Sequence, residues 1–302
     1  MPGSLDLESR NLTTVALQGS DYRGVSFELL CAEGDQVLAG AALMRDARRP
    51  EIRFAAPAAG RVSRIERGAR RKLLSLQIKV EQDAGVERFE TPGTDDPAAL
   101  RAFMLQSGAW SSLRTRPFGN IPNPDAEPAA IFVTALDAGP QSPEAAAIID
   151  VYFDEFSAAV ETLTKISPAP VYVCHAPNHT IGLESERLRC VAFDDALPGA
   201  HINALCPIGF AGGEVWQLGY QDVISLGSLL LNGSPWLQRV ISLAGSAVKN
   251  PRSLLLAPGG AIAELLDGAA AEYCSAGNQQ ENNNGRIHTD PRQMGTRSGG
   301  AV

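Results

Sequence analysis

Residues 33–43 read EGDQVLAGAAL and residues 56–62 read APAAGRV, and these two stretches decide how the N-terminal part of the chain folds. Glycine or proline stands wherever a turn is needed, and the short segments between them are apolar at alternate positions. The pattern extends outward from about residue 12 to residue 80, through VSFELL at 25–30 and IRF at 52–54. No helical period occurs in this region. The sequence therefore predicts a first domain, residues 12–90, built of short strands.

The two stretches together resemble the biotinyl/lipoyl carrier domain, a barrel-sandwich fold. In carriers, a lysine at the tip of the intervening hairpin is covalently modified. Here the tip reads DARRP at 46–50, and Lys72 is the first lysine of the chain. Arginine offers no usable amine nucleophile, so no biotin or lipoyl amide can form at this tip. We predict the barrel-sandwich fold without the carrier chemistry, and no covalently bound cofactor.

Residues 96–233 show the pattern of an α/β domain. A helix is predicted over 97–105, a buried strand over 129–134, a long amphipathic helix over 142–163, a second buried strand over 170–174 and a short helix over 222–231. Strand, helix and strand with short links indicate a parallel unit. We therefore expect a Rossmann-like central domain.

A third module is expected over residues 236–274. It reads strand, turn, strand, the pair Gly259-Gly260 and a short helix over 261–266. Residues 275–302 contain almost no apolar side chains, which predicts a disordered tail. The whole chain is thus expected to be a multidomain protein of the α+β or α/β class.

Composition excludes several classes of protein. The formal net charge of −8 disfavours nucleic acid as a partner, because phosphate binding is driven by clustered cations. No window approaches the ~20 apolar residues that cross a bilayer as a helix. The 5 cysteines are widely spaced without a C-x-x-C motif, which fits a reduced, cytosolic compartment.

Motifs for metal, nucleotide or covalent catalysis are missing from the sequence. His175 and His179 lie near Cys174, but their spacing does not match a tetrahedral zinc site. Neither G-x-G-x-x-G nor G-x-x-x-x-G-K occurs. We therefore predict no metal ligand and no catalytic residue in this chain.

The N-terminal domain is locally basic. Two interpretations stay open: a site for a phosphate-bearing ligand or an acidic partner, or a set of solvated hairpin loops. The cations in question are Arg45, Arg48, Arg49, Arg53, Arg61, Arg64, Arg67, Arg70, Arg71 and Lys72.

Several stretches together resemble one family, the A subunit of the bacterial sodium-translocating NADH:quinone oxidoreductase. They are FAAPAAG at 54–60, SGAWSSLRTRPF at 107–118, AIFVTALD at 130–137, VYVC at 171–174, YQDVI at 220–224, RVISLAG at 239–245 and NPR at 250–252. The resemblance extends from about residue 12 to residue 268. The family is also similar to the C subunit of the Rnf electron-transport complex, whose iron–sulfur cysteine clusters this chain lacks.

The resemblance implies a place in a larger machine. The complex oxidises NADH, reduces ubiquinone and exports sodium, using flavins and iron–sulfur centres. Its A subunit would lie peripherally at the cytoplasmic face of the bacterial inner membrane, against membrane-embedded and flavin-carrying subunits, and would have no activity alone. The third module would be part of a β-grasp fold of the soluble-ligand-binding (SLBB) type. Family members are expected to begin with a segment rich in lysine and glycine and to extend beyond residue 302.

The family's association with quinone directs attention to Trp110, Arg114, Arg116 and Phe118. An aromatic ring beside paired arginines offers an apolar wall and hydrogen-bond donors for a carbonyl headgroup. The alternative is that both aromatic residues belong to the core and that the arginines cap a neighbouring loop. For the whole chain, the alternatives are a redox-inactive assembly scaffold and an electron-transfer protein similar to the C subunit of the Rnf complex.

Overall fold

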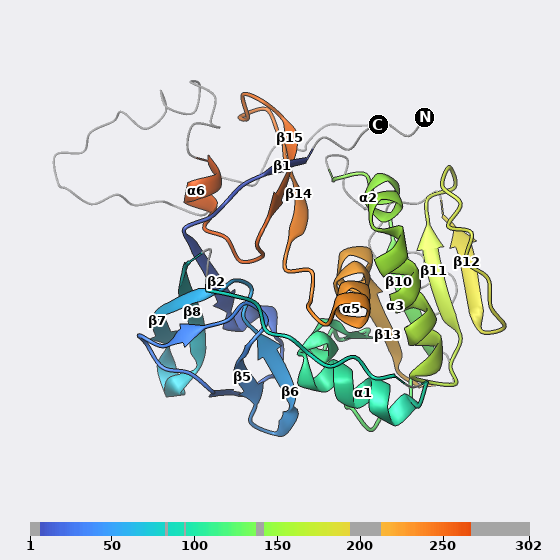
Figure 1. Cartoon of the computed structure of the whole chain (residues 1–302), viewed down its shortest axis with the longest axis horizontal. Coiled ribbons are helices and arrows are strands. Elements are labelled where there is room, and N and C mark those ends of the chain that lie inside the picture. The colour runs from blue at the N-terminus through green and yellow to red at the C-terminus, as the bar shows by residue number, and fades with distance from the viewer. Residues whose placement is uncertain (1–6, 82–83, 94, 137–141, 194–212, 267–302) are drawn as a thin grey trace, which may run out of the picture.

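The computed structural model describes residues 7–81, 84–93, 95–136, 142–193 and 213–266. The tail predicted over 275–302, and the part of the third module after residue 266, lie outside the described residues. The described chain forms 4 sheets. Figure 1 shows the N-terminal strands at lower left, the α/β part at right and a small third sheet above them.

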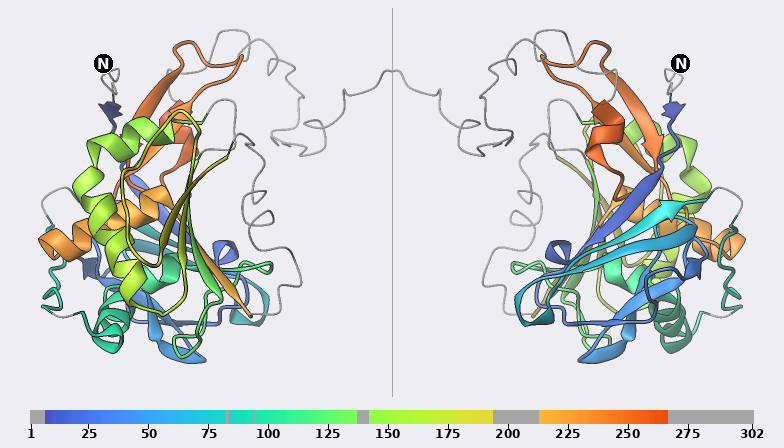
Figure 2. Two further views of the ribbon diagram at one scale, coloured as in Figure 1. Left: turned by 90° about the vertical axis from the view of Figure 1, so that its right-hand side faces the viewer. Right: turned by 90° about the vertical axis from the view of Figure 1, so that its left-hand side faces the viewer.

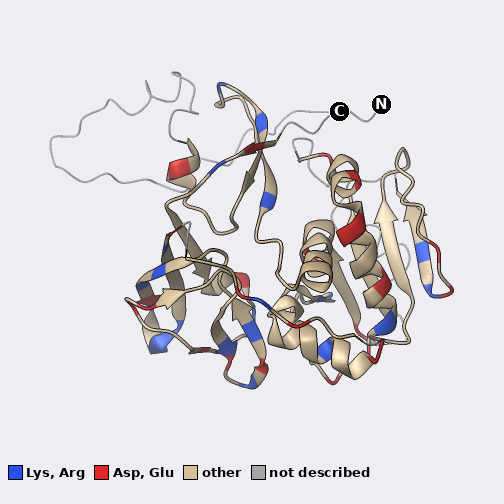
Figure 3. Cartoon of the chain, in the orientation of Figure 1, with Lys and Arg blue, Asp and Glu red and all other residues tan. Residues whose placement is uncertain are grey.

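The N-terminal part is built from strands, as the alternating pattern predicts. One sheet has the order β2 (Thr14–Gln18), β8 (Leu73–Val80), β7 (Gly60–Arg67) and β4 (Gln36–Val37). A second sheet has the order β3 (Phe27–Leu29), β5 (Ala42–Asp46) and β6 (Arg49–Ala55). Two short 3-10 turns lie in this part, η1 (Gly19–Asp21) and η2 (Ala69–Arg71). A further 3-10 turn, η3 (Ala109–Ser112), lies farther along the chain. Figure 3 shows that several basic residues of the chain lie on this N-terminal part.

The structure explains why the stretch APAAGRV at 56–62 has a glycine at position 60. Its φ is +150°, and a Cβ there would lie 2.1 Å from the carbonyl oxygen of Lys79. Strand β7 begins at this residue and pairs with β8, so any side chain would force the two strands apart.

The second part is one sheet covered by helices. Its order is β12 (Leu188–Ala192), β11 (Val171–His175), β10 (Ala130–Ala135), β13 (Val215–Gly219) and β9 (Arg114–Arg116). The first four strands run parallel, which confirms the predicted parallel unit, and β9 is antiparallel to β13. Figure 2 shows the helices α2, α3 and α5 on one side of this sheet. The Rossmann-like character of this domain stays a prediction.

Two of the predicted helices form close to their expected bounds. Helix α1 (Pro97–Gln106) starts where the Asp96 carboxylate accepts the N–H of Ala99 at 3.0 Å, and it buries Leu100, Phe103 and Met104. Helix α5 (Tyr220–Asn232) begins two residues before the predicted start and ends at Gly233, which has a left-handed φ of +68°.

The single helix predicted over 142–163 is wrong. The structure has α2 (Ala145–Val151) and α3 (Phe153–Lys165), separated at Tyr152, whose φ of −114° and ψ of 37° are not helical. The Tyr152 ring packs on Trp236, with centroids 4.8 Å apart. No glycine or proline marks the break, and a tertiary contact accompanies it. Local periodicity therefore could not reveal it.

The third sheet joins the two ends of the described chain. Strands β14 (Arg239–Leu243) and β15 (Arg252–Leu256) pair antiparallel, and α6 (Ile262–Leu266) follows, as predicted. Strand β1 (Leu7–Ser9) pairs with β15 in parallel, which no local pattern predicted. The SLBB-type β-grasp assignment for this module stays a prediction, as do all the predicted domain boundaries.

Candidate functional site

Polar and aromatic side chains line a cavity of about 480 Å³ at the junction of the three parts. The N-terminal part contributes Tyr22 to its wall. The α/β part contributes Arg114, Arg116 and Asp222, and the segment entering the third sheet contributes Trp236 and Arg239. All of these side chains are partly accessible or exposed, so a ligand can reach them.

The position of β9 explains why two arginines share one side of this cavity. Strand β9 pairs with β13, with Arg114 opposite Gln217 and Arg116 opposite Val215. Residues two apart on a strand point to the same side, while Thr115 between them is buried. Arg114 and Arg116 therefore both line the cavity.

Both arginines already have protein partners. Arg114 donates from Nη1 to the carbonyl oxygens of Ser111 and Leu113, and its guanidinium lies 5.7 Å from the centroid of the Tyr22 ring. Arg116 donates from Nε to the side chain of Gln217, whose Nε2 donates to Thr134 Oγ1 at 2.7 Å. Each guanidinium has five N–H donors, so each keeps donors that can face a ligand.

Arg239 forms the third cationic wall. Its guanidinium pairs with the Asp222 carboxylate in the first turn of α5 and lies 6.0 Å from the centroid of the Trp236 ring. The neighbouring Gln221 side chain accepts the N–H of Val240 at 2.8 Å and donates to its carbonyl oxygen at 3.0 Å. These contacts hold the start of β14 against α5.

Tyr22 supplies a neutral hydroxyl beside these cations. Burial raises the pKa of the Tyr22 phenol, and this effect exceeds the opposite influence of Arg114. The phenol is therefore protonated at neutral pH and can donate or accept a hydrogen bond. Aromatic faces, guanidinium donors and a neutral phenol together suit a planar ligand that carries carbonyl oxygens.

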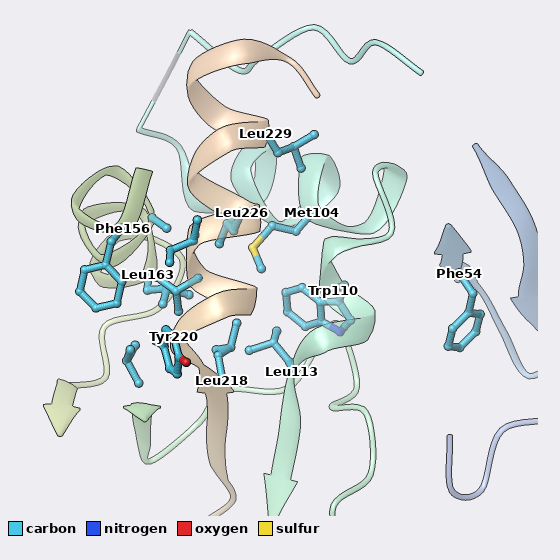
Figure 4. Packing of buried hydrophobic residues seen from close by; sticks show 14 of the residues in the cluster. Phe54, Met104, Trp110, Leu113, Phe156, Leu163, Leu218, Tyr220, Leu226 and Leu229 are labelled. Carbon is cyan, nitrogen blue, oxygen red and sulfur yellow. The ribbon is translucent and has the colours of Figure 1, made fainter. Parts of the chain in front are cut away.

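Only two of the four residues predicted to contact quinone lie at the cavity. Trp110 is fully buried, donates to the carbonyl oxygen of Pro122 at 3.1 Å and packs edge-on against Trp216. Figure 4 shows it beside Leu113 and Met104 inside the α/β part. Trp110 therefore packs in the core, as the alternative interpretation expects.

Phe118 lies outside both the core and this cavity. Its side chain is 73% exposed, and it is not among the residues that line the cavity. It is therefore not part of the core. The aromatic walls are instead Tyr22 and Trp236, which the residue pattern did not indicate. Asp222 and Arg239 belong to two of the stretches that carry the family resemblance. This membership was the only sequence signal that could have pointed to them as cavity residues.

The hairpin tip that carries the lysine in carrier domains is fixed in place here. The Asp46 carboxylate is buried and pairs with Arg49 at 3.1 Å. Arg49 Nη1 also donates to the carbonyl oxygen of Ile121 at 3.1 Å, which ties the tip to the α/β part. Arg49 thus bridges the two parts at this tip.

In the described part of the chain, neither a cluster of metal-ligating side chains nor a membrane-spanning helix is found. Among the described residues, no group of three or more His, Cys, Asp and Glu side chains is placed to hold a metal ion. His179 contacts the Asp150 carboxylate at 2.9 Å instead. Within the same ranges, no helix is long and apolar enough to cross a membrane.

Comparison with known proteins identifies the two larger parts. Residues 5–81 match the family model of the NqrA N-terminal barrel-sandwich hybrid domain, and residues 96–235 match that of the NqrA second alpha/beta domain. The chain belongs to the NqrA family. This confirms the family resemblance, the barrel-sandwich class of the first part and the α/β class of the second.

Curated NqrA proteins are similar over most of the chain. The A subunit of the Na(+)-translocating NADH-quinone reductase of Pseudomonas aeruginosa (strain UCBPP-PA14) is 38% identical over 271 residues, which is 86% of this chain and 60% of the relative. The protein of the same name from Vibrio atlanticus is 35% identical over 277 residues, 88% of this chain and 61% of the relative. That of Rhodopirellula baltica is 36% identical, covering 84% and 58%. The chain thus spans about 60% of the length of these NqrA relatives.

Proposed function

We propose that the chain serves as a peripheral subunit of a Na(+)-translocating NADH-quinone reductase. Its place is the cytoplasmic face of the inner membrane, with the membrane-embedded and flavin-carrying subunits as partners. In this proposal the assembled complex transfers electrons from NADH to ubiquinone and exports sodium, and the chain has no turnover alone. The support is the similarity to NqrA relatives that are named as subunits of this reductase, together with the match to NqrA domains over both larger parts of the chain.

The junction cavity is proposed to receive the quinone headgroup. Arg114 and Arg116 on one side of β9 would donate to its carbonyl oxygens, while the Tyr22 and Trp236 rings would flank its plane. The observation that carries this assignment is the joint lining of one cavity by these arginines and rings. The proposal retains the two predicted arginines and replaces the two predicted aromatic residues.

The test is quinone reduction by membranes in which this chain is expressed with its partner subunits. Replacing Arg116 by Ala, or Arg114 by Ala, is expected to lower turnover by about tenfold, because each loses a charge-assisted hydrogen bond made to the headgroup. Phe118→Ala is the control, since this exposed side chain lies outside the cavity. Membranes that retain the chain and show unchanged turnover in both arginine variants would disprove the quinone assignment.

A second candidate function is a redox-inactive assembly scaffold. The favouring observation is that all three arginines already bond groups of the chain itself. Arg114 and Arg116 do so within the α/β part, and Arg239 joins the start of β14 to α5. A scaffold would co-purify with the membrane subunits but would bind no short-chain ubiquinone analogue in calorimetry. Heat of binding that disappears in Arg116→Ala would instead favour the quinone site.

A further inference from the structure

A second hollow, of about 620 Å³, lies in the N-terminal part and has a strongly basic rim. The turn between β7 and β8 places Arg67, Arg70, Arg71 and Lys72 around it, and all four side chains are exposed. We propose that this hollow is an anion site that binds the phosphate group of a ligand. It shares no lining residue with the junction cavity, so the inference does not depend on the proposed quinone site.

These four cations differ from several other basic residues of the N-terminal part, because those others form ion pairs. Arg45 pairs with Glu28, Arg49 with Asp46, Arg61 with Glu81 and Arg64 with Glu66. Among the described residues, none of the four cations at the hollow forms an ion pair. Uncompensated like charges held close together repel each other, and a bound anion would relieve that repulsion.

The backbone of the turn is held in a conformation that costs free energy. Arg70 has φ of 55° and Arg71 has φ of 60°, two consecutive left-handed residues that are not glycine. In this conformation the Cβ of an L residue lies too close to the following carbonyl oxygen. Strained residues of this kind cluster at ligand sites. There a functional side chain is retained, although glycine would adopt the same backbone conformation at a lower cost in free energy.

The turn is also well ordered by its own hydrogen bonds. Gly68 donates to the carbonyl oxygen of Lys72 at 2.8 Å, and Lys72 donates back to that of Ala69 at 3.2 Å. Arg67 Nη1 donates to the carbonyl oxygen of Arg71 at 3.0 Å. The cations are therefore presented on a defined loop, so a ligand that binds them has less chain to order.

The charges around the hollow favour a phosphate over a cation or a neutral ligand. Glu28 is the one carboxylate among the lining residues, and Arg45 neutralises it through bonds of 2.7 and 3.0 Å. A guanidinium group can donate two parallel N–H bonds to two oxygens of the same phosphate, because its planar fork matches their spacing. Phe27, Leu29 and Leu73 provide an apolar floor for the rest of the ligand. The phosphate can belong to a free compound or to a phospholipid headgroup.

Two binding assays on the full chain distinguish these sources. The first titrates pyrophosphate by calorimetry. The second measures sedimentation with phosphatidylcholine vesicles that contain or lack phosphatidylglycerol. The test variant is R70G/R71G, which removes two cations and relieves the left-handed strain, so it should be at least as resistant to thermal unfolding as the parent chain. We expect it to weaken binding by about tenfold or more in the assay that contains the true source.

The matched control is R53Q/R64Q. It also removes two positive charges from the N-terminal part, but neither residue lines the hollow. It should bind like the parent chain. Pyrophosphate binding lost only in R70G/R71G assigns a free phosphate compound, and vesicle binding lost only in that variant assigns a lipid headgroup. Absence of binding in both assays, or equal loss in the control, would overturn the proposal.

Discussion

At the scale of single residues, burial decides which cysteine can react. Cys174 lies in β11 inside the α/β part and is fully buried, whereas Cys190 in β12 is exposed. Burial raises the pKa of the Cys174 thiol to about 12. Because the thiolate is the nucleophile, a thiol with this pKa is almost entirely unreactive near pH 8.

We therefore predict strongly unequal alkylation of these two cysteines. With iodoacetamide at pH 8, Cys174 should be modified at least about ten times more slowly than Cys190, because it has less thiolate and less access. Mass spectrometry of the two peptides measures the rates, and labelling in denaturant provides the reference in which both should react alike. Equal rates in the folded chain would contradict the structure.

Single residues also decide how much of the candidate site the sequence could predict. Trp110 and Phe118 lie eight positions apart in one stretch, yet one is fully buried and the other is 73% exposed. An aromatic residue favours burial in either place, so its type does not separate the two outcomes. Arg114 and Arg116 were predicted as a pair from the family resemblance. Strand β9, which was not predicted, places both on one side because alternate residues of a strand point the same way.

At the scale of elements, α3 and α5 pack unusually closely. Gly227 lies in α5 against α3, and a Cβ there would be 1.7 Å from the carbonyl oxygen of Glu155. The missing side chain lets the two backbones approach. Phe156 and Val160 of α3 and Leu226 of α5 are buried in the same hydrophobic cluster.

Gly227→Ala is therefore expected to destabilise the chain by about 1–3 kcal/mol or more, since overpacking outweighs the better helix propensity of alanine. Urea unfolding followed by circular dichroism measures the change. Gly93→Ala is the matched control because a Cβ at Gly93 would have nothing within 4 Å, and its stability should change by less than about 0.5 kcal/mol. Equal stability of the two variants would disprove the close helix contact.

At the scale of the whole molecule, the third sheet is locked to the N-terminal part. Ala16 donates to the carbonyl oxygen of Gly259 at 2.8 Å, and Arg10 Nη2 donates to that of Glu264 at 2.7 Å. The Glu264 carboxylate accepts the N–H and the hydroxyl of Thr13, both at 2.7 Å. The two parts therefore should not unfold independently.

The Glu264 contact predicts a pH dependence of stability. Hydrogen bonds from the Thr13 backbone and side chain lower the pKa of Glu264. A lowered carboxyl pKa contributes stability above the unfolded-state pKa of about 4.3, and this is lost as the pH falls through the folded-state value. Glu264→Gln removes the titrating group, so its unfolding free energy should fall less between pH 6 and pH 3.5 than that of the parent chain.

Urea unfolding at the two pH values measures this difference. Glu51→Gln is the control, because Glu51 is an exposed carboxyl group on β6 away from the third sheet. It should retain the pH dependence of the parent chain. If Glu264→Gln behaved like Glu51→Gln, the contact would not contribute to stability in solution.

The sequence by itself determined the strand-rich first part, the parallel α/β unit, the short strands and helix of the third module, and the absence of a lysine at the hairpin tip. Each of these depends on residue type and on spacing over a few positions. Only the tertiary structure decided that β1 joins β15, that the helix breaks at Tyr152 and that Tyr22, Arg114 and Arg239 share one cavity. It also decided which cations of the first part lack an anionic partner. These features arise from contacts between residues far apart in the chain, where burial and pairing geometry set the outcome and local spacing does not.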